Sequence, residues 1–212
     1  MNIEHIESGE TGDVYLLHNK IIEKITTYSS GVYEINEFKK LQGLYGIPKF
    51  LYKIEYKNCN FKGKYNKGVL DRQTNKLINK GKGIGICMEY VGKYTLDDHS
   101  MLMKIDLEKI LFNACFIAYE MWTIKKLNHG DLHRRNVIFD ECKSFQKTYI
   151  IGKTKFTIRN QRYKVYLVDF EHCSSNHEMY DIANLCLYFP KYKTNQMKIE
   201  DFFKKKFSQF IC

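Results

Sequence analysis

Residues 127–140 read Leu-Asn-His-Gly-Asp-Leu-His-Arg-Arg-Asn-Val-Ile-Phe-Asp and place His129, Asp131 and Asn136 within eight positions. Imidazole, carboxylate and amide groups can move protons or hold a metal ion. Apolar residues at helical spacing precede this segment over residues 107–121, and the apolar residues 137–139 follow it. The pattern predicts a core helix, a polar turn and a buried strand, which together form a rigid support for polar chemistry.

A second pattern lies near the N-terminus, where residues 6–17 predict two strands joined by a turn that contains Gly9 and Gly12. Because glycine has no Cβ, backbone N–H groups in such a turn can come close to phosphate oxygens. In the next strand, residues 21–26, alternation places Lys24 on one face with Ile22 and Thr26. The pattern alone leaves Lys24 as either a surface lysine or a ligand-binding one.

Apolar positions then recur at helical spacing from Ile35 to Leu44, which predicts a helix that stops before Gly46. Glu34 and Glu37 lie three positions apart on one face of this helix. Each is either a solvated carboxylate or the partner of a cation.

Three further segments complete the expected elements. Residues 49–82 predict a strand followed by a long, basic hairpin or loop, and residues 85–92 a buried strand that enters a loop. Residues 141–164 predict a basic hairpin that turns at Gly152 and Lys153, and the strand after it ends in Asp169-Phe170-Glu171.

The glycine turn, the segment 127–140 and the Asp-Phe-Glu string resemble, in this order, the glycine-rich loop, catalytic loop and metal-binding signature of the protein-kinase-like phosphotransferases. The resemblance covers roughly residues 6–190. It implies an α+β, two-lobed, protein-kinase-like fold that forms one kinase domain. Residues 1–91 would form a nucleotide-binding antiparallel sheet with one helix, and residues 92–212 a reduced, mainly helical lobe.

The resemblance also implies roles in the second half of the chain. Asp131 would hold the acceptor hydroxyl and receive its proton, while Asn136 and Asp169 would bind Mg²⁺. Glu171 would add a direct or indirect contact to the metal. Asp181, in a following helix, would brace the catalytic loop.

In the first half, the resemblance implies that Lys24 contacts the α- and β-phosphates of ATP, with Lys20 as the weaker candidate. Residues 34–48 resemble the corresponding region of the casein kinase group of protein kinases, and this alignment pairs Glu34 with Lys24. Glu37 is the fallback.

The nucleotide-binding residues implied by the resemblance come from the turn and the strands around it. Met88 would lie at the back of the adenine pocket, and the backbone of Glu89 and Val91 would hydrogen-bond the base. The full set of implied nucleotide-binding residues is Gly9, Gly12, Val14, Lys24, Met88, Glu89 and Val91.

Departures from the usual motifs bear on the acceptor. His133 stands where protein kinases have a lysine, as in aminoglycoside phosphotransferases and the haspin group, and Arg134 or Arg135 could supply the missing positive charge. Gly130 replaces the arginine that anchors a phosphorylated activation loop, so no activation by phosphorylation of that loop is expected. Glu7 replaces the first glycine of the glycine-rich loop.

Composition limits the class of protein. A chain of 212 residues with 44% hydrophobic residues is long enough for a proper core. No secretory signal or membrane span is expected, and seven cysteines without motif spacing predict reduced thiols in the cytoplasm or nucleus. The net charge of +10 allows a nucleic-acid or anionic-surface partner, although solvated lysines on a basic protein are the favoured explanation.

The leading functional hypothesis is an intracellular serine/threonine protein kinase that uses ATP and Mg²⁺ to phosphorylate a protein substrate. The first alternative is a small-molecule kinase of the aminoglycoside/choline type, which is favoured by His133, Glu171 and Tyr180-Asp181-Ile182. A catalytically dead pseudokinase or basic nucleic-acid-binding module is the second alternative.

Overall fold

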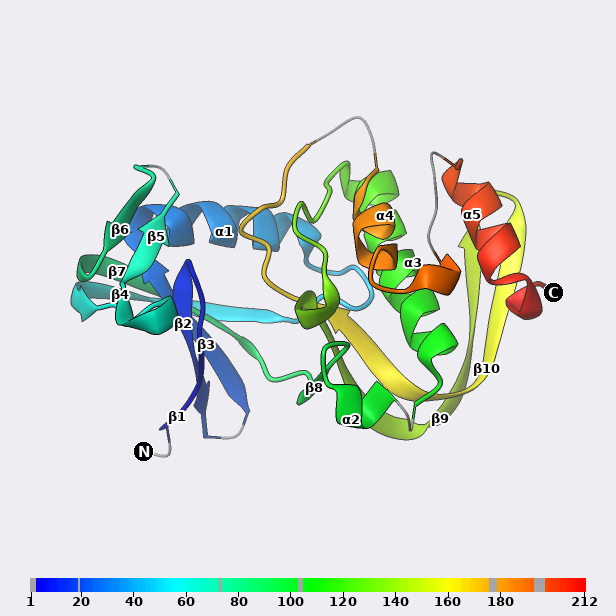
Figure 1. Ribbon diagram of the computed structural model, residues 1–212, viewed down its shortest axis with the longest axis horizontal. Coiled ribbons are helices and arrows are strands. Elements are labelled where there is room, and N and C mark those ends of the chain that lie inside the picture. Colours follow the sequence, from blue (N-terminus) through cyan, green and yellow to red (C-terminus); the bar gives the residue numbers. More distant parts are fainter. Residues whose placement is uncertain (1–2, 19, 73, 103–104, 176–178, 193–196) are drawn as a thin grey trace. The chain divides into compact units, whose positions relative to one another are not determined.

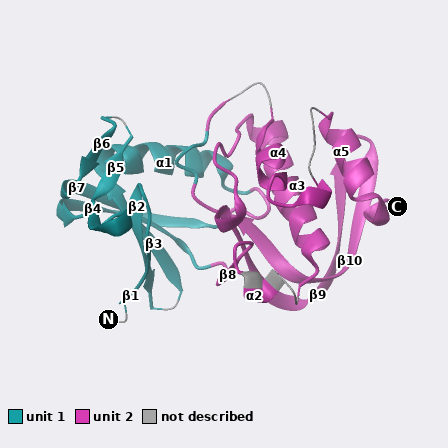
Figure 2. Cartoon of the chain, viewed as in Figure 1, with its two compact units in different colours: residues 1–43, 48–90, 170–173 teal, residues 44–47, 91–169, 174–212 magenta. Residues whose placement is uncertain are grey.

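A computed structural model describes residues 3–18, 20–72, 74–102, 105–175, 179–192 and 197–212. The chain divides into two compact units, which are coloured separately in Figure 2. Unit 1 comprises residues 1–43, 48–90 and 170–173, and unit 2 comprises residues 44–47, 91–169 and 174–212. Each unit therefore takes a short segment from a distant part of the chain.

Unit 1 is built on an antiparallel five-stranded sheet with the order β1-β2-β3-β7-β4 (Figure 1). Its strands are β1 (Ile3–Ser8), β2 (Gly12–Leu17), β3 (Ile21–Thr27), β4 (Phe50–Asn60) and β7 (Lys80–Glu89). Lys24 lies on the central strand β3, between Val14 of β2 and Ile86 of β7. Between β4 and β7 the chain forms the 3-10 turn η1 (Lys64–Asn66) and a separate small hairpin of β5 (Val69–Asp71) and β6 (Lys76–Ile78).

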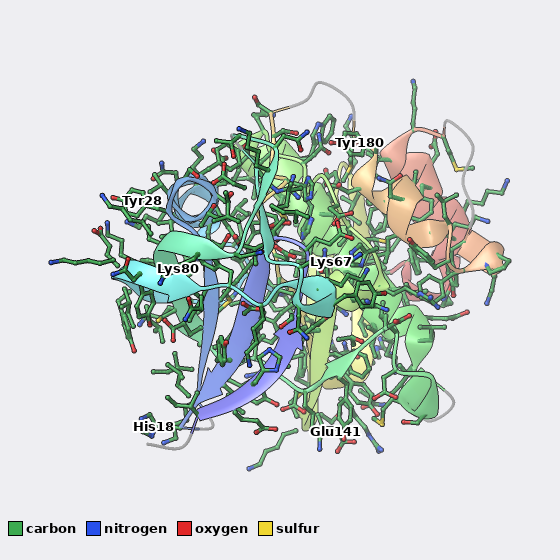
Figure 3. The ribbon with its side chains drawn as sticks, turned by 60° about the vertical axis from the view of Figure 1, so that its left-hand side comes forward. His18, Tyr28, Lys67, Lys80, Glu141 and Tyr180 are labelled. Carbon is green, nitrogen blue, oxygen red and sulfur yellow. The ribbon has the colours of Figure 1, made fainter. Side chains whose placement is uncertain are left out.

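The α-helix of unit 1, α1 (Tyr28–Leu41), begins seven residues before Ile35, where the predicted apolar pattern starts (Figure 3 labels Tyr28). Thr27 caps it by accepting a hydrogen bond from Ser30 N–H. A Cβ at Gly31 would lie 2.5 Å from Ile84 Cγ2, so this glycine lets the first turn pack closely on β7. The serines and the glycine conceal the start of the helix in the sequence, because all three are poor residues for a helix interior.

Unit 1 buries the apolar face of α1 against the sheet. Ile35, Phe38 and Leu41 are buried together with Ile84 on β7. Phe38 also stacks on Phe170, with ring centroids 5.1 Å apart, so the short segment 170–173 contributes to this core.

Unit 2 contains an antiparallel three-stranded sheet with the order β10-β9-β8. Its elements are β8 (Tyr94–Thr95), α2 (His99–Leu102), α3 (Leu107–Lys125), η2 (Arg134–Asn136), β9 (Val137–Ile151), β10 (Thr154–Leu167), α4 (Asp181–Cys186), η3 (Pro190–Tyr192), α5 (Ile199–Lys206) and η4 (Ser208–Phe210). Phe112 of α3 lies at the centre of an aromatic core. Its ring contacts Tyr149 of β9, Phe156 of β10 and Phe203 of α5.

The predicted helix at residues 107–121 and the predicted hairpin around Gly152 are both confirmed. The expectation of a mainly helical second half is wrong: the described part of the chain is mainly sheet, with 41% strand against 31% helix, and its second half contains the long β9–β10 hairpin. The long β9–β10 hairpin was underestimated because its solvent-facing positions are charged. Register shifts between Ile158 and Tyr163 also break the alternation that reveals a strand.

Among the helices of the described residues, none combines the length and the apolar character needed to cross a membrane.

Candidate functional site

Lys24 is buried in unit 1, with 6% of its surface exposed. Its side chain runs beside Gly12, where a Cβ would lie 3.2 Å from both Cγ and Cε of the lysine. Gly12 thus leaves room for the aliphatic part of Lys24. This is a second reason for glycine here, besides the expected approach of backbone N–H groups to phosphate. The same strand pairing places Val14 directly beside Lys24.

The structure brings Lys24 and Glu34 together. The Lys24 Nζ atom lies 3.0 Å from Oε2 of Glu34, which is 2% exposed on α1. The fallback residue Glu37 instead binds Lys40, at 2.6 Å. Because a buried carboxylate requires a counter-charge, the Lys24–Glu34 ion pair balances two groups that would otherwise be unfavourable in the core.

Glu171 is a second carboxylate on the same ammonium, since its Oε2 atom lies 2.9 Å from Lys24 Nζ. Its other oxygen, Oε1, lies 3.0 Å from Nη2 of Arg72. Burial alone would raise the pKa of the Glu171 carboxyl, but the Lys24 charge, the Thr11 hydroxyl and the Arg72 charge lower that pKa to about 2. Glu171 is therefore an anion shared between two cations.

The glycine turn between β1 and β2 is held by its own backbone and by the segment after β4. Gly9 N–H donates to Gly12 O at 2.8 Å, and Gly9 O accepts from Lys64 N–H at 2.8 Å. The buried Asp13 carboxylate accepts from the N–H groups of Lys62 and Gly63, at 2.9 and 3.0 Å. Figure 3 labels Lys67 in this segment. These bonds give the turn one defined conformation.

The residues expected at the adenine lie on or just after β7. Met88 is buried on that strand, between Ile22 of β3 and Phe50 of β4. Glu89 N–H donates to Lys49 O at 3.0 Å, and the Glu89 carboxylate accepts from Lys49 N–H at 2.8 Å. Val91 is the first residue of the second segment of unit 2.

In unit 2, the segment 127–140 follows α3 as a turn that is braced by a buried carboxylate. Asp181 Oδ2 accepts from His129 N–H at 2.6 Å, and its Oδ1 accepts from Gly130 N–H at 3.0 Å. Burial raises the pKa of Asp181, while the charge of His129 and these two donors act in the opposite direction. The predicted bracing role of Asp181 is confirmed.

The peptide of Val168 ties this turn to the end of β10. Val168 N–H donates to Asn136 O at 3.1 Å, and Val168 O accepts from His129 Nε2 at 2.8 Å. The next residue, Asp169, has a φ of +69°. A non-glycine residue in this left-handed region is strained, and such strain is found mainly at functional sites, although aspartate tolerates it better than most residues.

Asn136 is oriented by its amide nitrogen, which donates to Asp131 O at 2.9 Å. The Oδ1 atom is therefore the amide atom that can coordinate a cation. An amide oxygen and the Asp169 carboxylate are hard oxygen ligands of the kind that Mg²⁺ prefers, so these two residues suit that ion. Asp131 itself is about half exposed, at 47% of its side chain, so its carboxylate is accessible to solvent.

His133 is the neighbour of Asp131 in this turn. Its Nδ1 atom accepts from Arg135 N–H at 3.2 Å, which places the proton of a neutral ring on Nε2. Nε2 lies 3.5 Å from Asp131 Oδ2. Arg134 and Arg135 both bind Asp97, at 2.9 and 3.0 Å, so the two candidate replacements for the missing lysine are held by one carboxylate.

No model of a known protein family matches the sequence, and no curated protein matches it significantly. Any function must therefore be inferred from these residues and their contacts.

Two residues of these ion pairs, Arg72 and Asp97, were not predicted from the sequence. Arg72 lies in the hairpin turn between β5 and β6, inside the segment that was expected only as a basic hairpin or loop. The alternation in Val69–Asp71 and Lys76–Ile78 around a short polar segment was the available signal for this hairpin. Asp97 had no comparable signal, because an acidic residue in a short loop is common.

Proposed function

We propose that this protein transfers the γ-phosphate of ATP to a serine or threonine hydroxyl of a protein. The observation that carries the proposal is the buried Lys24–Glu34 ion pair beside the glycine turn. A buried ion pair is weak evidence for stability, because its desolvation offsets its attraction. Its position on a central strand, beside the glycine turn, favours a role in binding a phosphate anion.

In this proposal, the positively and negatively charged residues have different roles. Lys24 binds phosphate oxygens of ATP, and Glu34 fixes the position of the ammonium. The Asp131 carboxylate accepts the proton of the acceptor hydroxyl. The hydroxyl oxygen forms a bond to the γ-phosphorus as the bond between that phosphorus and the ADP oxygen breaks. Mg²⁺ bound by Asn136 and Asp169 would neutralise phosphate charge. The half-exposed position of Asp131 keeps its carboxylate accessible to a large acceptor.

The test is an assay of label transfer from [γ-³²P]ATP with Mg²⁺, run in parallel on a mixture of protein substrates and on a panel of aminoglycosides and amino alcohols. The proposal expects label on protein serine or threonine, lost in Asp131→Asn. Label on the small molecules alone would replace the protein acceptor by a small hydroxyl compound. Absence of any ATP turnover, together with RNA binding that weakens steeply with salt, would replace the enzyme by a nucleic-acid-binding module.

A further inference from the structure

Arg72 is attached to a well-anchored part of unit 1. The residue before it, Asp71, is buried, and its carboxylate accepts from the Thr27 hydroxyl at 2.6 Å and from Thr74 N–H at 2.8 Å. Arg72 N–H donates to the Ser30 hydroxyl at 3.1 Å. Because Thr27 and Ser30 begin α1, the hairpin turn is fixed to the helix that carries Glu34.

The guanidinium of Arg72 is directed by this anchor onto Glu171. Nη2 lies 3.0 Å from Glu171 Oε1, and Nη1 lies 3.0 Å from His172 Nδ1. Arg72 remains 29% exposed, whereas Glu171 is 7% exposed. One cation from a partly solvated turn therefore holds a buried carboxylate by the oxygen that Lys24 does not use.

This division of the two oxygens matters for a phosphate ligand. The Lys24 ammonium already has two carboxylates within 3.0 Å. A phosphate that binds Lys24 must displace one of them or repel both, because all three groups are anions. Glu171 can leave Lys24 without becoming an isolated buried charge only if another cation keeps it paired.

We infer that Arg72 is a positioning residue that holds Glu171 while the Lys24 ammonium exchanges this carboxylate for a phosphate of the nucleotide. The inference rests on the proposed function and deepens it. Arg72 acts through Glu171 and need not touch ATP. Removing Arg72 leaves Glu171 more dependent on Lys24, so the carboxylate competes more strongly with the nucleotide.

The experiment measures KM for ATP and kcat in Arg72→Met, Arg72→Lys and Glu171→Gln, and in the double variant Arg72→Met/Glu171→Gln. Arg72→Met should raise KM about tenfold and change kcat less than about twofold, since it alters binding before the transition state. Arg72→Lys should restore most of the loss, because a lysine supplies the charge without the planar fork. Arg159→Met, which removes an exposed arginine on β10 of unit 2, is the control.

The double variant gives the decisive comparison. Without the Glu171 carboxylate, Arg72→Met should change KM less than about twofold, so the two substitutions should be strongly non-additive. An equal effect of Arg72→Met in both backgrounds, or a parallel loss of kcat and melting temperature, would mean that Arg72 only supports the fold. If Arg72→Met does not fold, two other comparisons of KM test the same inference. One compares the double variant with Glu171→Gln, and the other compares Arg72→Lys with wild type.

Failure of this inference differs from failure of the proposed function. A wild-type protein that transfers phosphate but shows the same KM in Arg72→Met contradicts only the role of Arg72. A wild-type protein that transfers no phosphate to any acceptor contradicts the proposed function.

Discussion

The Lys24 ammonium lies between two buried carboxylates, Glu34 and Glu171. Replacing Lys24 by methionine keeps the length of the side chain but leaves Glu34 without this counter-charge. We expect Lys24→Met to lower the free energy of unfolding by about 3 kcal/mol, the usual effect of breaking a buried pair from one side. Denaturant unfolding followed by circular dichroism measures this.

The matched control is Lys40→Met, which removes the exposed partner of Glu37 and should change stability by less than about 1 kcal/mol. The double variant Lys24→Met/Glu34→Gln should recover part of the lost stability but no phosphate transfer. Equal stability of Lys24→Met and wild type would show that the pair is solvated in solution.

Asp131 is a half-exposed carboxylate whose backbone carbonyl is fixed by Asn136. Asparagine keeps its shape but cannot accept a proton, so Asp131→Asn should reduce phosphate transfer about a thousandfold, within the range of general base catalysis. Nucleotide affinity, measured by calorimetry, should stay within about twofold of wild type. Asp140→Asn on β9 is the control, and loss of ATP binding in Asp131→Asn would assign this carboxylate to binding instead.

At the residue level, the sequence was informative where a motif is local. His129, Asp131 and Asn136 are close in sequence, and the structure places them in one hydrogen-bonded turn. The contact between Arg72 and Glu171 joins residues separated by 99 positions. Such a contact depends on how a hairpin packs against a helix, which spacing along the chain does not encode.

The β5–β6 hairpin is held to the start of α1 by the Asp71 carboxylate. Burial would raise the pKa of Asp71, but hydrogen bonds from Ser29, Thr27 and Thr74 lower it from the usual 3.8 to about 2. A carboxyl whose pKa is lower in the folded state stabilises the protein fully above its unfolded pKa. This stabilisation is lost as the pH falls from about 4 through 2.

We therefore expect Asp71→Asn to be about 2 kcal/mol less stable than wild type at pH 6, with the difference approaching zero near pH 2. Guanidinium unfolding at several pH values measures the difference. Asp201→Asn, at an exposed carboxylate of α5, should show no such dependence. A difference that stays constant with pH would mean that the asparagine disrupts packing instead of removing a charge.

At the level of elements, strong periodicity predicted α3 and the turn of the β9–β10 hairpin, because apolar spacing is regular there. The start of α1 was missed, since it begins with the polar residues Thr27, Ser29 and Ser30, two of which donate hydrogen bonds to Asp71. The β5–β6 hairpin was expected only as a hairpin or loop without defined strands. The Asp71 carboxylate, which is distant in sequence, thus stabilises a helix start that the Ser29-Ser30-Gly31 sequence does not favour by itself.

For the molecule as a whole, the proposed function predicts that Mg-ATP raises the melting temperature. A ligand that binds only the folded state at a hundred times its Kd adds about 2.7 kcal/mol of stability. The shift should require Mg²⁺ and should be largely lost in Lys24→Met. Differential scanning fluorimetry with ATP, with and without Mg²⁺, measures it, and a shift that is the same with inorganic triphosphate would show that the base is not recognised.

The division into units was the part of the architecture least accessible from the sequence. Residues 1–91 and 92–212 were expected as contiguous parts, whereas each observed unit includes residues from the other range. Phe170 is part of unit 1 because it stacks on Phe38, and Glu171 because it forms an ion pair with Lys24. Both contacts join residues that are more than 100 positions apart in the sequence.

This interleaving has a consequence for how the gene can be divided. A fragment that ends at Tyr90 would encode the five strands and the helix of unit 1, but not the segment 170–173. Phe38 would then expose the face that stacks on Phe170, and Lys24 would keep one carboxylate instead of two. A single cut between Tyr90 and Val91 therefore does not separate the two units, because it removes residues 170–173 from unit 1 and leaves residues 44–47 of unit 2 on the first fragment.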